Sequence, residues 1–212
     1  MVHRSRKARN LAAHGRARRP RSQVEQQLIA ILRLAYSGEM AAGYAYHGHW
    51  RSVTNADERT RIQRIENEEW HHRELVGEML KRLKARPRKL RETRAAIIGR
   101  SLGVLCYAIG WLAPMYGAGK LESRNIREYE TAARYARDSG HDELVECLLT
   151  MAEVEWEHEA YFRARVQSHR WGRRLRLWPQ PAPREAIRLT FAAEIRHAVV
   201  EARGAAAPAQ LY

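Results

Sequence analysis

Two copies of a Glu-x-x-His motif can each place a carboxylate beside an imidazole. The copies are Glu69-Trp-His-His72 and Glu155-Trp-Glu-His158. Residues three apart lie on one face of a helix, so each pair can bind one metal ion. A single motif of this kind is a weak signal in a chain rich in Glu and His. The motifs become informative if other helices place further ligand-type residues on their buried faces, close to the two motifs.

The spacing of apolar residues indicates where those further ligands are. A 4-3-4-3 pattern runs through four segments, and such a pattern marks the buried seam of a helical bundle. Each segment carries one Glu in its seam, and two segments add a His one turn later. The ligand-type residues of the four seams are Glu39, Glu69, His72, Glu122, Glu155 and His158.

Buried carboxylates stay ionised only when a metal ion or another positive partner compensates them. Four Glu and two His that converge in a bundle core are the donor set of a di-iron or di-manganese carboxylate site. Four carboxylates would balance two divalent ions, which leaves the site near neutral. We therefore predict two Fe ions as the cofactor, with Mn as the alternative because carboxylate-rich sites accept either metal.

Two tyrosines also face the seams. We expect Tyr46 and Tyr129 to be core residues, and the sequence also allows either to hydrogen-bond a ligand or to relay an electron. A second Glu-x-x-His pair, Glu68 and His71, lies one residue outside the seam. We place that pair at the surface or in a second layer around the metals. His49 is expected to pack at the end of the bundle.

Two more acids lie beside the seam of the last motif. Glu153 and Glu157 flank Glu155 in the sequence, and we expect both to remain solvated. The ligand set proper therefore contains six side chains and no others.

Long helices must position these side chains, and Ala, Leu, Arg and Glu dominate the chain, as helices prefer. Residues 101–119 carry no charge, but Pro114 and four glycines weaken the case for a membrane span. We predict an amphipathic crossover helix there, buried or facing a membrane. The expected helices cover residues 22–52, 57–85, 95–119, 118–137, 142–168 and 184–202. The fold class is all-α, a ferritin-like antiparallel four-helix bundle with an additional apolar crossover helix and a short C-terminal helix.

The length of 212 residues suits one domain with a sizeable core. We expect a disordered basic arm over residues 1–21 and the di-iron bundle over residues 22–170. Residues 171–212 then form a Pro-containing linker and a C-terminal helix or tail.

The net charge of +14 is concentrated in three tracts. Residues 1–22, 81–94 and 163–176 hold eight, eight and six basic residues, with a single acid among them. The remainder of the chain is acidic. Such tracts attract anionic lipid or nucleic acid without reading sequence, so no sequence-specific nucleic-acid partner is expected.

Cysteine content and the N-terminus bear on the compartment. The chain has two cysteines and no Cys-x-x-Cys pair, which favours a reducing compartment. The N-terminus lacks the apolar core of a signal peptide. We expect a cytoplasmic protein, peripheral at the inner membrane if it meets one. The sequence also allows a homo-oligomer.

Around the six candidate ligands the sequence resembles the demethoxyubiquinone hydroxylase family of the ferritin-like superfamily. The first helix contains Gly38-Glu39-x-x-Ala42-x-x-x-Tyr46-x-Gly48, which is similar to the opening segment of that family. The two Glu-x-x-His motifs match, and Leu121-Glu122 is followed by Tyr129. The intervals between the four Glu are 30, 53 and 33 residues, close to the family pattern.

The resemblance covers about residues 25–165 and implies a di-iron monooxygenase at a membrane surface. Its substrates would be dioxygen and a quinone with a long isoprenoid tail, and the 95–119 segment would admit that tail. An external electron donor is implied, because the chain shows no flavin or nicotinamide site of its own. We expect the open metal positions to face a pocket lined by the seam and by residues 95–119.

Two other functions fit parts of the pattern. A ferritin-like or rubrerythrin-like protein would use similar ligands to oxidise iron or remove peroxide. A non-enzymatic helical adaptor would use only the basic tracts, at a membrane or on nucleic acid. If the crossover helix spans the bundle, residues 81–94 and 163–176 lie at opposite ends, which argues against one continuous nucleic-acid groove.

Overall fold

The computed structural model describes residues 21–205, and this part of the chain is helical with no strand. The elements are α1 (Gln23–Ser52), α2 (Ala56–Arg82), α3 (Lys89–Leu105), α4 (Leu112–Asp138), α5 (Asp142–Ser168), the 3-10 turn η1 (Gly172–Arg174) and α6 (Arg184–Ala205). The all-α prediction is confirmed. The predicted basic arm of residues 1–21 lies outside the described residues except for Arg21, as do residues 206–212 of the predicted tail.

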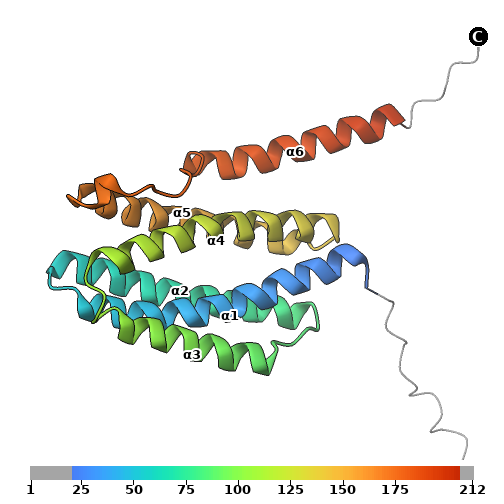
Figure 1. Ribbon diagram of the computed structural model, residues 1–212. Helices are drawn as coiled ribbons and strands as arrows, with labels where there is room; N and C mark the ends of the chain where they lie inside the picture. The colour runs from blue at the N-terminus through green and yellow to red at the C-terminus, as the bar shows by residue number, and fades with distance from the viewer. Residues whose placement is uncertain (1–20, 206–212) are drawn as a thin grey trace, which may run out of the picture.

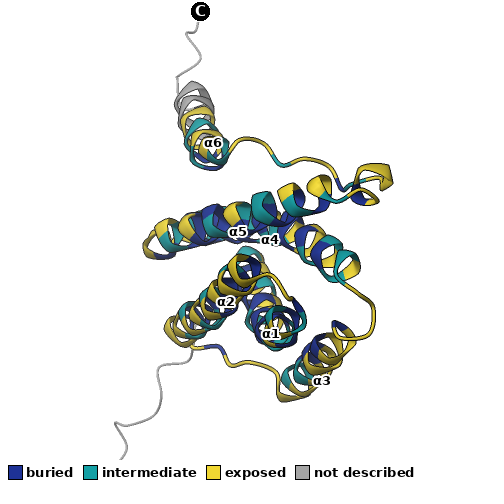
Figure 2. Ribbon diagram, turned by 90° about the vertical axis from the view of Figure 1, so that its left-hand side faces the viewer, coloured by how far each residue is buried: buried dark blue, intermediate teal, exposed yellow. Residues whose placement is uncertain are grey.

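Two antiparallel helical hairpins form the body of the molecule (Figure 1). The first consists of α1 and α2, the second of α4 and α5, and the two pack face to face. Helix α3 runs back along the outer side of α1, and α6 lies over α4 and α5 (Figure 2). Helix α3 carries the chain from one end of the bundle to the other, and residues 169–183 form the longest connection without an α-helix.

Polar residues set the ends of the long helices. The Ser22 hydroxyl accepts a hydrogen bond from the Glu25 amide, and the Asn55 side chain accepts one from the Glu58 amide. Each cap satisfies a backbone N–H that has no partner within its helix. Helix α4 ends at Asp138 with Ser139 as its cap, and Gly140 takes a φ of 76°, which favours glycine. These signals explain why the predicted ends of the four long helices agree with the structure within a few residues, apart from the start of α4.

The apolar segment 95–119 is not one helix, and that prediction was wrong. Helix α3 ends at Leu105, residues 106–111 turn, and α4 begins at Leu112. Gly110 adopts a φ of 76° in the turn, and Pro114 lies in the first turn of α4, where a missing N–H costs nothing. No helix among the described residues is both long and apolar enough to cross a membrane.

Helix α3 is seated on α1 by small residues. Ala95, Gly99 and Gly103 are its buried positions, one per turn. A Cβ added to Gly103 would lie 2.7 Å from the carbonyl oxygen of Tyr44, and one added to Gly48 would lie 2.2 Å from the carbonyl oxygen of Gly103. The outer face of α3 remains exposed and apolar, with Leu90, Ile97, Ile98, Leu102, Val104 and Leu105.

The C-terminal helix α6 docks on the second hairpin through Ile187 and Phe191, which join the core. Arg188 lies across α5 and donates to Glu153 at 2.8 Å. Glu153 is consequently buried, so the prediction that it stays solvated was wrong. Glu157 keeps about half of its side chain exposed, 49%, as expected.

The linker before α6 is also held to the bundle. The carboxylate of Glu159 accepts from Arg163 and from the indole N–H of Trp178. The Arg163 guanidinium in turn donates to the Trp178 and Pro179 carbonyl oxygens. Residues 175–183 therefore follow the surface of the second hairpin.

The two basic tracts that the structure describes lie at opposite ends of the bundle (Figure 1). Residues 81–94 surround the α2–α3 connection at the end where α1 begins, and Arg21 donates there to the Leu83 carbonyl. Residues 163–176 occupy the other end. The predicted separation of these tracts is confirmed.

The core is divided along the bundle axis into two apolar clusters. One contains Leu28, Leu32, Val76, Met79, Leu144 and Leu148, and the other contains Val53, Ile62, Ile65, Met115, Phe162 and Val166. The seam acids lie between these clusters. Charged groups placed there are shielded from water on both sides, which makes their mutual interactions strong.

Candidate metal centre

Four helices bring all six predicted ligand residues into the middle of the seam. Glu39 comes from α1, Glu122 from α4, and the two Glu-x-x-His pairs come from α2 and α5. Each of the six side chains is buried, with at most 3% of the residue exposed. They form two groups of four, and within each group the ligand-type atoms lie within 4.8 Å of one another. The groups are Glu39, Glu69, His72 and Glu155, and Glu69, Glu122, Glu155 and His158.

The two groups share Glu69 and Glu155, which makes the cluster a double site. Each group adds one private carboxylate and one private imidazole to the shared pair. A carboxylate has two oxygens, so a shared Glu can contribute one to each of two neighbouring ions. The arrangement is compatible with a pair of metal ions bridged by Glu69 and Glu155.

Two tyrosines connect the hairpins reciprocally. The Tyr46 hydroxyl of α1 donates to the Glu122 carboxylate of α4. The Tyr129 hydroxyl of α4 donates to the Glu39 carboxylate of α1. Each tyrosine lies seven residues after the Glu of its own helix and contacts the Glu of the other helix. Both tyrosines are buried, as expected of core residues, and each hydrogen-bonds a candidate ligand.

The two histidines are held differently. His72 Nδ1 lies 3.0 Å from Glu155 Oε1, whereas His158 Nε2 lies 2.7 Å from Glu68 Oε2. Glu68 itself accepts from Arg64 on the surface. This confirms Glu68 in the layer outside the six residues, while His71 is exposed.

Burial and crowding change how readily the carboxyl groups ionise. Burial is the largest influence on Glu39, Glu69 and Glu122, and it raises the pKa of each. The charge of Glu155 raises all three pKa values further. Three of the four carboxyl groups therefore keep their protons at pH values above the ordinary carboxyl pKa unless a cation replaces those protons.

Glu155 and the two histidines show the opposite balance. Burial alone would raise the pKa of Glu155, but hydrogen bonds with His158 and His72 bring it below its usual value. Burial would lower the pKa of His72 and His158, and their bonds to Glu155 raise both instead. The centre thus contains one carboxyl group of lowered pKa between two imidazoles of raised pKa.

Several buried atoms of the cluster lack a hydrogen-bond partner. They are Oε2 of Glu39, both carboxylate oxygens of Glu69 and Nδ1 of His158. Nδ1 of His158 and Oε1 of Glu69 lie 3.2 Å apart as an ion pair, without a hydrogen bond between them. Buried polar atoms are almost always paired, so an unpaired group of this size points to an ion as the partner. The donor atoms are carboxylate oxygens and imidazole nitrogens, which suit iron and manganese. The residues present therefore fit a pair of such ions.

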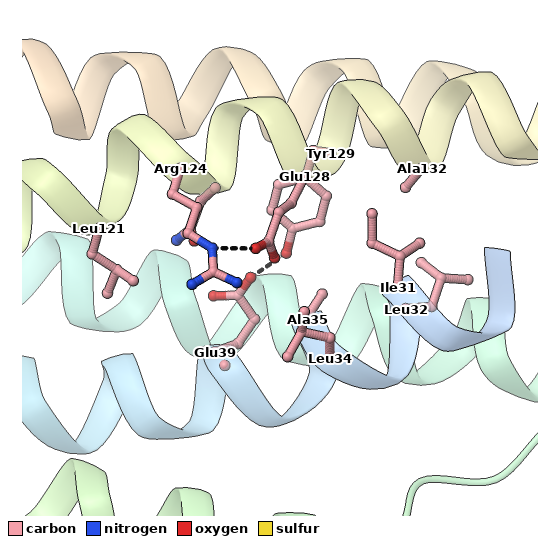
Figure 3. Close-up of a pocket in the computed structure, with 12 residues that line it drawn as sticks. Ile31, Leu32, Leu34, Ala35, Glu39, Leu121, Arg124, Glu128, Tyr129 and Ala132 are labelled. Atoms are coloured by element: carbon pink, nitrogen blue, oxygen red, sulfur yellow. Dashed lines mark hydrogen bonds and ion pairs between the residues drawn. The ribbon is translucent and has the colours of Figure 1, made fainter. Parts of the chain in front are cut away.

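A cavity of about 170 Å³ leads from the surface to this cluster between α1 and α4. Glu39 and Tyr129 lie at its inner end, and an Arg124–Glu128 ion pair lies at its rim (Figure 3). The remaining wall is mainly apolar and includes Ile31, Leu32, Leu34, Ala35, Leu121 and Ala132. Residues of α3 do not line the cavity, so the prediction that the 95–119 helix forms its wall was wrong. The cavity residue closest in sequence to this segment is Leu121 of α4, which follows residue 119 and is therefore not part of the segment.

The family model of the ubiquinone biosynthesis protein COQ7 matches residues 26–160. The chain belongs to the COQ7 family. The match spans α1 to α5 and includes all six buried Glu and His residues, and it confirms the resemblance noted from the motifs. Membership of this family supports an oxidoreductase, a hydroxylase of ubiquinone biosynthesis. Comparison with the curated proteins gave no significant match, and comparison with the solved structures gave none either.

The part of the chain beyond the COQ7 match begins within α5 and contains η1, the linker and α6. Its linker and α6 pack on the second hairpin. The end of α5 also contacts the first hairpin, since Phe162 stacks on Tyr46 and Arg165 pairs with Glu58. This part of the chain contributes none of the six residues of the centre, so the candidate centre is built entirely from the part shared with the COQ7 family.

One residue of the centre was missed by the motif analysis. The Asn125 amide nitrogen lies 3.0 Å from Glu122 Oε2 and 3.4 Å from Glu155 Oε2. It also lines the cavity. Its position three residues after Glu122 places it on the same helical face, and that spacing is the signal that could have found it.

His49 packs as expected. Its ring stacks on Phe162 and Tyr46, with ring centres 5.9 and 6.2 Å apart. Burial lowers its pKa to about 4, so the ring is neutral at ordinary pH. It packs against Phe162 and Tyr46 of the apolar cluster beside the centre and takes no part in either group of four.

Proposed function

We propose that this chain is a di-iron monooxygenase that hydroxylates the ring of a quinone or a similar lipophilic compound with dioxygen. The observation that carries the proposal is the pair of four-residue groups that share Glu69 and Glu155. A ferritin-like arrangement accounts for it, with a Glu on two helices and Glu-x-x-His on the other two. The COQ7 family membership supplies the substrate class.

In this proposal Glu39, Glu69, His72, Glu122, Glu155 and His158 hold the two ions. When bound, a pair of iron ions supplies electrons and open coordination positions for the activation of dioxygen. Manganese is the alternative metal. Tyr46 and Tyr129 orient the carboxylates of Glu122 and Glu39 through their hydroxyl groups.

The cavity between α1 and α4 is the proposed route for the substrate ring. Its apolar wall excludes water from the buried carboxylates, and the Asn125 amide is a polar group that reaches the cavity and the carboxylates together. An apolar cavity with few polar groups is the usual form of a small-molecule site. Its small volume admits a ring but leaves a long tail outside.

The overall reaction is balanced by an external donor. One oxygen atom of dioxygen enters a ring C–H bond, and the other leaves as water. Two electrons and two protons are needed in addition, and the proposed source is a separate reductant of the nicotinamide or flavin class.

The outer face of α3 is the proposed contact with a membrane surface. Leu90, Val104 and their apolar neighbours expose between 43% and 71% of their area. Soluble proteins rarely expose so many large apolar side chains together. A substrate with a lipid tail is delivered from a bilayer, and α3 lies beside α1, which forms one wall of the cavity.

Metal content tests the proposal. The purified chain, reconstituted with ferrous iron under anaerobic conditions, should hold two irons per chain. Its optical spectrum should differ from that of the metal-free chain. The double variant Glu69→Ala, Glu155→Ala should lose both. Glu74→Ala, Glu157→Ala is the matched control, since it removes one exposed Glu from each of the same helices.

Turnover then tests the substrate. The iron-loaded chain should hydroxylate a short-tailed quinone that lacks the ring hydroxyl, with consumption of dioxygen and of a chemical reductant. A wild-type chain that binds no iron would overturn the di-iron proposal. An iron-loaded chain that oxidises ferrous iron or peroxide but leaves the quinone unchanged would favour the ferritin-like or rubrerythrin-like alternative.

A further inference from the structure

The segment after α5 carries four arginines on the surface of one end of the bundle. Arg170, Arg173, Arg174 and Arg176 are all exposed. Within the described part of the chain, none of them forms an ion pair, whereas Arg163 and Arg165 of the same tract are bound to Glu159 and Glu58. The four charges therefore remain available to an anionic partner.

A tryptophan lies among these charges. Trp171 is 49% exposed, and the guanidinium groups of Arg170 and Arg174 lie 5.2 and 4.9 Å from the centre of its ring. Cations over an aromatic face stabilise this arrangement. An exposed tryptophan with a polar edge is typical of side chains that sit at the boundary between lipid headgroups and acyl chains.

The same end of the bundle also exposes apolar side chains. His169 stacks on Trp111 with ring centres 5.3 Å apart, which places the arginine segment against the α3–α4 turn. That turn presents Tyr107 and Ile109, which are 60% and 44% exposed, and Val104 at the end of α3 is 71% exposed. In Figure 1 the turn and the arginine segment lie together at the left-hand end of the molecule.

The combination of unpaired arginines and exposed apolar side chains favours one class of binding partner over others. A nucleic acid would neutralise the arginines but would leave Val104, Tyr107 and Ile109 in water. An apolar protein groove would cover those side chains but would gain nothing from four unpaired cations. A bilayer with anionic lipids satisfies both, because phosphate groups meet the arginines while apolar side chains enter the interface.

We propose that residues 169–176 and the α3–α4 turn form one docking surface for a bilayer that contains anionic phospholipid. This surface is called the end patch below. It rests on the proposed function at a membrane surface, and its arginine segment lies beyond the residues matched by the COQ7 family. The outer face of α3 supplies apolar area, while the end patch supplies the preference for negative charge and fixes which end of the bundle faces the bilayer.

Flotation of the full-length, iron-loaded protein with lipid vesicles tests the end patch. The protein should bind vesicles of phosphatidylcholine mixed with phosphatidylglycerol, and it should bind vesicles of phosphatidylcholine alone much less. The variant Arg173→Glu, Arg174→Glu, Arg176→Glu should lose at least about a hundredfold in binding to the anionic vesicles. Each lost cation accounts for roughly fivefold, and the added carboxylates are repelled as well.

The matched control reverses three exposed charges at the opposite end. Arg82→Glu, Arg88→Glu, Lys89→Glu changes the net charge by the same amount, and it should retain most of the binding. Equal losses in the two variants would overturn the proposal, because binding would then follow net charge alone. Unchanged binding in the arginine variant, or a wild-type protein that binds duplex DNA and not anionic vesicles, would overturn it as well.

Trp171 provides a second readout that does not depend on affinity. Lipids brominated near the headgroup should quench part of the fluorescence of the wild-type protein, and that part should be absent in Trp171→Phe. Equal quenching in both proteins would place Trp171 outside the bilayer and overturn the end patch.

The proposed chemistry is tested separately. The arginine variant should keep its two irons and its turnover of a short-tailed quinone in detergent. Loss of iron in the wild type would sink the di-iron proposal while leaving the vesicle result intact, so the two failures can be told apart.

Discussion

The two halves of the metal centre are built on the same plan and differ in their surroundings. The pocket half is Glu39 with His72, and the braced half is Glu122 with His158. Each half combines a Glu from the first helix of one hairpin with a His from the second helix of a hairpin, and each Glu accepts from a tyrosine of the other hairpin. Glu69 and Glu155 belong to both.

The braced half has polar neighbours that the pocket half lacks. His158 bonds to Glu68, and Glu122 accepts from Asn125. At the matching positions near the pocket half the chain has Val154, which precedes Glu155, and Ala42, three residues after Glu39. The cavity opens on the pocket half, with Glu39 and Tyr129 in its lining.

This difference shows how one bundle can separate firm binding of a metal ion from access for a substrate. Outer hydrogen bonds fix the orientation of a ligand and raise its affinity for metal. Small apolar neighbours leave room for a substrate. The comparison therefore predicts that the braced half holds its ion firmly, while the pocket half is where dioxygen and the quinone ring arrive.

The largest effects should come from the carboxylates that the halves share. Glu69→Ala or Glu155→Ala should abolish binding of both irons, whereas Glu39→Ala or Glu122→Ala should leave one iron in the other half. Iron content per chain, with Glu74→Ala as the exposed control, measures the difference. If all four variants lost the same amount of iron, the division into two halves with shared ligands would be wrong.

The pH dependence of stability tests a property that both halves share, which is the burial of ionisable Glu and His side chains. In the metal-free protein the raised pKa values of Glu39, Glu69 and Glu122 mean that the folded chain binds protons more tightly than the unfolded chain. The raised pKa values of His72 and His158 act in the same direction.

The free energy of unfolding of the metal-free protein should therefore fall as the pH rises from 4.5, the ordinary carboxyl value, towards the raised values. Each unit by which a pKa is raised accounts for about 1.4 kcal/mol of this loss. Iron binding displaces those protons, so the stabilisation by iron should grow over the same range. Urea unfolding at several pH values, with and without iron, measures both trends. A metal-free protein whose stability rose with pH over this range would contradict the account of the buried charges.

Glu68 tests the bracing directly. Glu68→Gln should weaken binding of the iron in the braced half by about 10-fold to 100-fold, the usual cost of losing an outer partner of a metal-bound His. The iron of the pocket half should be nearly unaffected. Iron titration followed by absorption measures the two affinities, and Glu78→Gln, an exposed change on the same helix, is the control. Equal weakening of both irons would show that Glu68 does not belong to one half.

The smallest effect should come from narrowing the cavity. Gly38 lines it and has no atom within 4 Å of an added Cβ. Gly38→Leu should raise the KM for the quinone several-fold while iron content is unchanged. It should also stabilise α1 by up to about 1 kcal/mol, because glycine is a poor helix former.

Gly117→Leu is the matched control for the cavity. Gly117 also lies in a helix with free space around it, but it is outside the cavity. It should gain similar stability without a change in KM. A rise in KM in both variants would remove the cavity between α1 and α4 as the substrate route.

The sequence predicted those parts of the molecule that follow from local periodicity. The seam spacing placed Glu39, Glu69 and Glu122 on buried helix faces, and the predicted starts of the first two helices lie within one residue of the capped ends of α1 and α2. Both signals depend on neighbours within one or two turns. Both signals can therefore be read from the sequence without knowledge of how the helices pack.

Features that depend on packing between distant segments could not be read in the same way. Glu153 is buried because the Arg188 side chain of α6 lies across α5. No local sequence pattern predicts where α6 docks. The cavity wall depends on which helix lies against α1. The break at residues 106–111 had a local signal in Gly110 and Pro114, but the uncharged run around them outweighed it.

The close contact between Gly48 and Gly103 has a consequence for genetic variation in this protein. Neither glycine fills space in the four-helix core, so a small side chain at either position would leave folding, solubility and iron content largely intact. It would nevertheless push α3 away from α1, because an added Cβ lies within 2.7 Å of backbone atoms. Substitutions at these two positions would thus pass a screen for a folded protein and fail a screen for growth that depends on a membrane-borne substrate.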